Sequence, residues 1–124
     1  MKWTRIIAGA VALTVTVFLF AGDQPVRTFR GEISDSQCAL NVHSLTRSHQ
    51  EMLKSKSMGG TAAECSRYCI EHLGGRLVLA AGANVYYIDG ADSGMQYLGQ
   101  KVRIRGILDA KAKTIHVVTI DPEK

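Results

Sequence analysis

Six side chains that can bind a metal ion or, in the case of cysteine, form a disulfide occur in one 35-residue window of this sequence. They are Cys38, His43, His49, Cys65, Cys69 and His72. The chain has three cysteines in all, and because this number is odd, at least one thiol cannot enter an intramolecular disulfide. Thiolates are soft ligands and imidazole binds both zinc and copper, so these residue types predict either a soft-metal site or a disulfide.

Cys65 and Cys69 lie in a segment that carries the signals of a helix between residues 62 and 73. Thr61, followed three residues later by Glu64, forms a capping-box pattern. Residues four apart in a helix project from the same face, so the two thiols are expected roughly 6 Å apart. This spacing suits two ligands of one ion better than a disulfide, which needs Cβ atoms about 3.8 Å apart.

Cys38 is the expected third ligand, because it comes directly after the first predicted strand. His49 is the expected fourth, since it lies far enough into the following segment to fold back toward the cysteines. His43 and His72 rank behind it. Three cysteines and one histidine form a closed zinc set, and copper(I) also suits thiolate ligands. The sequence therefore predicts a zinc or copper site formed by Cys38, Cys65, Cys69 and His49.

A disulfide from Cys38 to Cys65 or to Cys69 is the competing interpretation, since cysteine pairs form disulfides in oxidising compartments outside the cytoplasm. Closing a loop of about 27 to 31 residues stabilises a fold by roughly 3 to 4 kcal/mol in the chain-entropy description. The chain would then be a non-catalytic structural or interaction module. The disulfide would tie down its insertion, the segment at residues 36–75. A thiol/disulfide-responsive module is a third alternative, in which the reduced form binds metal and the oxidised form does not.

Other function classes have little support. The sequence shows no Ser/His/Asp order, phosphate-binding loop or HExxH motif, so it predicts a binding module and not an enzyme. The formal charge of +4 includes Lys2 and Arg5, and the remaining 13 basic and 11 acidic residues leave only +2. Aromatic residues make up only 6% of the chain, which argues against a base-stacking surface, so no nucleic-acid partner is expected. The expected partner is a metal ion, or else a small ligand or protein of unknown identity.

Residues 1–22 are predicted to be a targeting segment. Lys2 and Arg5 precede an uncharged, mostly apolar run at residues 6–20, which is shorter than the about 20 residues that a membrane-spanning helix needs. We expect a cleaved signal peptide, with an uncleaved N-terminal anchor as the alternative. In both cases the domain is expected in the periplasm or secreted, touching a membrane only through residues 1–22 if these are retained.

The rest of the chain predicts a mainly β fold with a helical insertion. Alternating apolar residues indicate five strands, at 26–33, 76–81, 84–89, 101–109 and 114–120. One or two helical turns are expected between the third and fourth strands, and Gly106 predicts a bulge in the fourth. This order of elements is typical of the five-stranded oligonucleotide/oligosaccharide-binding (OB) barrel. We therefore expect an OB-like barrel at residues 26–121, with an insertion at 36–75 between its first two strands.

Two polar residues are interpreted as structural. Asp35 lies in the sequence Ser34-Asp35-Ser36, which is typical of a turn, and we expect it to end the first strand. His116 lies beside Val117 on the last predicted strand and is expected on the outer surface. Neither residue is assigned to the predicted metal site.

Two cysteine motifs also characterise the chain: DSQCA at residues 35–39 and CSRYC at 65–69. This pattern, D-S-x-C-A followed by C-x3-C, resembles that of a group of small exported bacterial proteins that have no established activity. The segments KVRIRGILD at 101–109 and TIHVVTI at 114–120 resemble the last two strands of the same group. The resemblance covers about residues 28–121, and it implies an exported, OB-like protein without implying a reaction.

Overall fold

The computed structural model describes residues 22–40, 51, 54–56, 59–90 and 94–124. Within these residues the strands are β1 (Arg27–Asp35), β2 (Leu77–Ala81), β3 (Asn84–Asp89), β4 (Lys101–Asp109) and β5 (Thr114–Pro122). The helices are α1 (Ser36–Ala39), α3 (Ala62–His72) and the short 3-10 helix η1 (Gly94–Tyr97). The prediction of a mainly β fold is confirmed.

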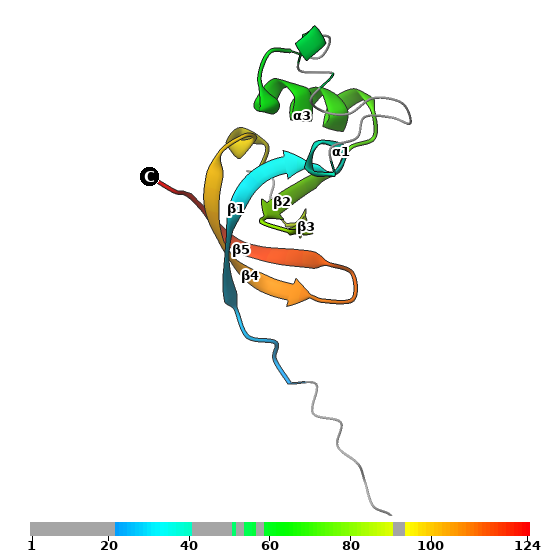
Figure 1. The fold of residues 1–124 in the computed structure, drawn as a ribbon. Helices are drawn as coiled ribbons and strands as arrows, with labels where there is room; N and C mark the ends of the chain where they lie inside the picture. The colour runs from blue at the N-terminus through cyan, green and yellow to red at the C-terminus, as the bar shows by residue number, and fades with distance from the viewer. Residues whose placement is uncertain (1–21, 41–50, 52–53, 57–58, 91–93) are drawn as a thin grey trace, which may run out of the picture.

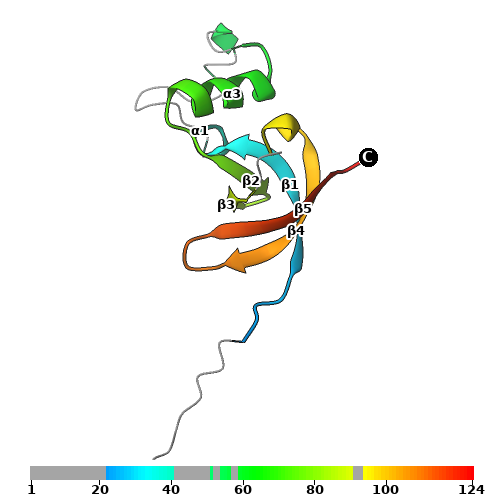
Figure 2. The same ribbon diagram turned by 180° about the vertical axis from the view of Figure 1, so that it is seen from behind.

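The five strands of the described residues form a closed ring of pairings in the order β1-β2-β3-β5-β4. Strands β3 and β5 run parallel, and the other four neighbouring pairs run antiparallel. Because β1 pairs with both β2 and β4, neither of its long edges is left open. Figures 1 and 2 show the strands curving around a common interior, with α3 lying across one end.

One apolar cluster fills the inside of the ring. Its buried members are Phe29, Ile33, Leu79, Leu98, Val102, Ile104 and Ile115. Gly106 continues the inward-facing alternation of β4, and a Cβ at this position would lie 2.5 Å from the backbone oxygen of His116. The register between β4 and β5 shifts between Arg105 and Gly106, so the predicted bulge is confirmed.

Helix α3 is attached to the ring by both apolar and polar contacts. Ala63 and Ile70 pack against the apolar cluster from one side of the helix. The buried Ser66 places its hydroxyl oxygen 3.4 Å from that of Ser34 on β1. The helix is therefore held over the end of the ring where β1 ends and β2 begins, as Figure 1 shows.

The end of β1 differs from the prediction. Ser34 and Asp35 do not form a turn, because they pair with Val78 and Leu77 of β2 and extend the strand by two residues beyond the expected end. Helix α1 begins directly afterwards. This extension places Asp35 inside the protein, where a turn residue would have been at the surface.

The chain between β1 and β2, where the sequence predicts the insertion 36–75, carries α1 and α3. The predicted targeting segment, residues 1–22, lies almost wholly outside the described residues. Within the described part of the chain, no helix has the length and apolar character needed to cross a membrane.

Candidate metal centre

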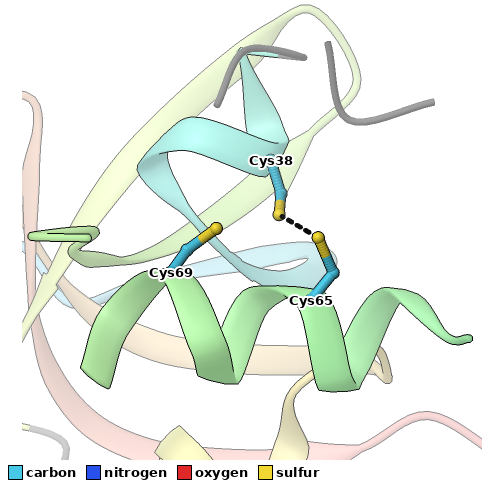
Figure 3. A group of neighbouring side chains, drawn as sticks. All are labelled: Cys38, Cys65 and Cys69. Atoms are coloured by element: carbon cyan, nitrogen blue, oxygen red, sulfur yellow. Dashed lines mark hydrogen bonds between the residues drawn. The ribbon is translucent and has the colours of Figure 1, made fainter. Parts of the chain in front are cut away.

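The three cysteines meet between α1 and α3. Their Sγ atoms all lie within 4.8 Å of one another, and the Sγ atoms of Cys38 and Cys65 are 3.8 Å apart. Figure 3 shows Cys65 and Cys69 projecting from the same face of α3 toward Cys38, as their spacing of four predicts. No disulfide joins these three described residues. The arrangement is compatible with a metal site.

The start of α3 is fixed by the predicted capping box. The hydroxyl oxygen of Thr61 accepts a hydrogen bond from the backbone N–H of Glu64 at 3.2 Å. In return, the Glu64 carboxylate accepts from the backbone N–H groups of Gly60 and Thr61, at 2.7 and 3.1 Å. The hydrogen bond from Gly60, followed by those from Thr61, lowers the pKa of Glu64. Because the helix begins at a defined residue, Cys65 and Cys69 have a defined direction toward α1.

Cys38 is positioned by the carboxylate of Asp35. This residue is the N-cap of α1, and its Oδ1 accepts hydrogen bonds from the backbone N–H groups of Gln37 and Cys38, at 2.8 and 3.2 Å. The N–H of Ser36 donates to the carbonyl of Arg76, whose own N–H donates to the Ser36 hydroxyl. The end of β1 and the start of β2 together therefore hold α1, and with it Cys38, against α3.

The three thiols are shielded from water to different degrees. Cys65 and Cys69 are fully buried, and Cys38 is half-buried. Burial is the largest cause that raises the pKa of each thiol. A side-chain hydrogen bond with Asp35 is the next largest cause for Cys38, and the nearby charge of Asp35 raises the pKa of all three thiols further. The pKa of Cys69 rises to about 12. In the absence of a bound ion, the thiols are therefore protonated at neutral pH.

Asp35 is the functional candidate that sequence reasoning missed. Its side chain is fully buried, and its Oδ2 has no hydrogen-bond partner among the described residues. Within the same residues no basic side chain forms an ion pair with it. Leaving a buried carboxylate oxygen without a partner is costly. One signal in the sequence could have found it, because an Asp three residues before Cys38 has the spacing of an N-cap.

The sulfur positions fit a metal ligand set closely. With zinc–sulfur bonds of about 2.3 Å, two sulfurs of a tetrahedral site lie about 3.8 Å apart. The pair Cys38–Cys65 already has this separation, and the longest sulfur separation in the group is at most 4.8 Å. A disulfide would instead require two sulfurs to approach to about 2.05 Å. Binding an ion therefore needs a smaller rearrangement than closing a disulfide.

No histidine of the described residues joins the three sulfurs as a ligand. His43 and His49 lie outside the described residues, so the predicted fourth ligand stays a prediction. His72 is exposed at the end of α3, where its ring lies 4.7 Å from that of Tyr68. His116 is on the outer surface, as expected, with Nδ1 3.0 Å from a carboxylate oxygen of Asp89. Among the described residues, the ligand atoms that come together are the three sulfurs alone.

An open hollow of about 410 Å³ adjoins the site on the side of Cys38. Ser34 and Ala62 line it together with this cysteine, and Glu32 and Lys101 lie farther along its wall. Cys38 lines this hollow, whereas Cys65 and Cys69 have no exposed surface.

Comparison of the chain with protein-family models, with curated proteins and with solved structures found no match in any of the three. The resemblance to small exported bacterial proteins therefore stays a prediction.

Proposed function

We propose that this chain is an exported binding domain that holds one soft metal ion, zinc or copper, between Cys38, Cys65 and Cys69. The single observation that carries the proposal is the approach of three sulfurs, from two segments far apart in the sequence, to within 4.8 Å of one another. Thiolates are preferred ligands of both ions. A disulfide would use only two of the three cysteines, whereas a metal site uses all three.

Metal binding at this site would also stabilise the fold. Cys38 belongs to α1 at the end of β1, whereas Cys65 and Cys69 belong to α3. An ion bound to all three would link α3 to the ring of strands, and any ion that binds the native state alone raises its stability. Binding requires that the thiols lose their protons, so affinity is expected to increase with pH.

We further propose that the ring of strands is an OB-like barrel. The strand order β1-β2-β3-β5-β4, the parallel neighbours β3 and β5 and the bulge at Gly106 support this description. In this architecture α1 and α3 lie outside the barrel wall and build a site that the barrel alone would lack.

Location outside the cytoplasm, in the periplasm or as a secreted protein, is part of the proposal. It is supported by the positively charged start and apolar run of residues 1–22. A soft-metal site built from cysteines is chemically sensitive in such a compartment, because oxidation of two thiols removes two of its ligands.

A second candidate follows from the pair Cys38 and Cys65, whose sulfurs lie 3.8 Å apart between α1 and α3. An external protein disulfide could oxidise the two thiols, taking up two electrons and two protons as their S–S bond forms. The product would be a domain whose insertion is tied down covalently and which presents a surface to a protein or small ligand. This candidate assigns no role to Cys69.

Metal content and reactive thiols, measured on the same protein preparation, separate the two candidates. The protein should be expressed with its export segment and purified without an affinity tag, since a histidine tag binds zinc and copper itself. We expect one equivalent of metal, and three thiols that react with a thiol reagent only after chelation. A metal-free protein with one reactive thiol, which takes up neither zinc nor copper after reduction, would establish the disulfide module instead.

A further inference from the structure

Asp35 is a carboxyl group buried beside the three cysteines. Its side chain has no exposed surface, and among the described residues its Oδ2 lacks a hydrogen-bond partner. Its Oδ1 accepts a hydrogen bond from the backbone N–H of Cys38, so the carboxyl group lies beside the first of the three cysteines. Its oxygens are not among the ligand atoms that lie within 4.8 Å of one another, so the side chain must turn toward the sulfurs when an ion binds. A buried charge is normally paired or bound to a metal, and no basic side chain in the described part of the chain pairs with this carboxyl group.

Capping α1 does not explain why the residue is an aspartate. The cap uses Oδ1 alone, which accepts both backbone hydrogen bonds. Asparagine and serine cap helices about as well as aspartate does, and neither would place a charge in the interior. The second carboxylate oxygen and its charge therefore need another explanation.

Gly75 allows the carboxylate to lie against the end of α3. A Cβ at this position would lie 3.0 Å from Oδ1 of Asp35 and 3.0 Å from the backbone carbon and oxygen of Cys69. The Gly75 N–H also donates to the carbonyl of Cys69 at 2.9 Å. Asp35 and the helical turn that carries Cys69 thus approach the same point, where an added Cβ would force these atoms apart.

We propose that Asp35 supplies the fourth ligand of the bound ion through its Oδ2, and that this oxygen makes the site selective for zinc over copper(I). The inference rests on the proposed function, in which the three cysteines bind one soft ion. Zinc accepts a carboxylate oxygen at about 2.0–2.2 Å in the same coordination sphere as thiolates. Copper(I) is soft and gains little from an oxygen ligand.

The charge of the site favours the same ion. Three thiolates and one carboxylate carry a formal charge of −4, of which a zinc ion offsets two units and a copper(I) ion only one. Residual charge is expensive in a buried site. The carboxylate therefore adds both an oxygen donor and a negative charge that suit a divalent ion.

The test compares Asp35→Asn with the wild-type chain for both metals. Asparagine retains the cap of α1 and removes the anionic oxygen. We expect the zinc affinity of D35N to fall by at least about tenfold, the smallest loss common for groups that support a metal site. Copper(I) affinity is expected to change by less than a factor of about three, so the ratio of the two affinities falls. Both are measured on reduced protein without oxygen, by competition with a coloured chelator for each metal.

Each outcome of this comparison has one meaning. An unchanged zinc affinity in D35N overturns the role of Asp35. The role is also overturned if His49→Ala lowers the zinc affinity and D35N does not. An equal loss of both metals in D35N overturns the selectivity. A wild-type chain that binds neither metal overturns the proposed function itself. Asp35→Ser, which also retains a cap, must repeat the zinc loss of D35N, and His116→Ala must bind both metals as the wild type does.

Discussion

The Sγ atoms of Cys38 and Cys65 lie 3.8 Å apart, although 26 residues separate the two cysteines in the sequence. This distance is the one expected between two thiolates of a tetrahedral zinc ion. It results from two local structures, the capped start of α3 and the short helix α1 that follows β1 directly. The separation of these two sulfurs is thus set by elements that the protein forms without metal.

Cys69 distinguishes the metal account from the disulfide account. If all three sulfurs bind one ion, Cys69→Ser is expected to lower metal affinity by more than about 100-fold, because even groups outside the first coordination sphere contribute about 10- to 100-fold. Competition titration of the reduced protein measures the loss, with Cys38→Ser and Cys65→Ser as parallel variants. Wild-type affinity in C69S would contradict a site of three cysteines and favour the Cys38–Cys65 pair.

The raised pKa values of the thiols predict a pH dependence of stability in the reduced, metal-free protein. Burial, followed by the charge of Asp35, raises the pKa of Cys69 from an ordinary 9.0 to about 12. Between these values the native state holds a proton that the unfolded state has lost, so stability decreases as pH rises. We expect the full contribution below about pH 9 and a progressive loss above it.

Denaturant unfolding at a series of pH values from 7 to 10 checks this sign. Two controls isolate the thiols from lysine and tyrosine, which titrate in the same range. C69S is expected to lose less stability than the wild type over the series. The zinc-loaded wild type is also expected to lose less, since its thiols are already deprotonated. A stability that increases with pH in the metal-free protein would contradict the assigned burial of these thiols.

Gly75→Ala tests the close approach of Asp35 to α3. The added Cβ would lie 3.0 Å from Oδ1 of Asp35 and from the backbone of Cys69, so these atoms must move apart. We expect a destabilisation of about 1–3 kcal/mol, as for other overpacked sites, together with weaker metal binding. Gly60→Ala is the matched control, because a Cβ there has no atom within 4 Å. Equal stability of the two variants, measured by chemical unfolding, would contradict the described packing.

Much of the fold follows from local sequence patterns. The bounds of β3 and β4 agree with the alternating segments at 84–89 and 101–109. The capping box of α3 and the bulge at Gly106 were also predictable, because each depends on residues close together in the chain or on one missing side chain. The convergence of Cys65 and Cys69 follows from helical spacing alone.

The environment of Asp35 could not be predicted in the same way. Local sequence at residues 34–36 favours a turn, whereas pairing with Val78 and Leu77 of β2 extends the strand. The burial of the carboxylate further depends on Gly75, which is distant in sequence and offers no side chain to obstruct it. Tertiary pairing therefore overrides the local turn preference, and the predicted turn residue becomes a buried neighbour of the candidate site.

X-ray absorption at the zinc edge, on reduced untagged protein loaded with one equivalent of zinc, tests whether the three cysteines bind one ion. It reports the atoms bound to the ion and their distances. The account predicts three sulfur neighbours at about 2.3 Å and one lighter neighbour at about 2.0–2.2 Å. A coordination shell of nitrogen and oxygen alone, or one with fewer than three sulfurs, would contradict a metal centre formed by Cys38, Cys65 and Cys69.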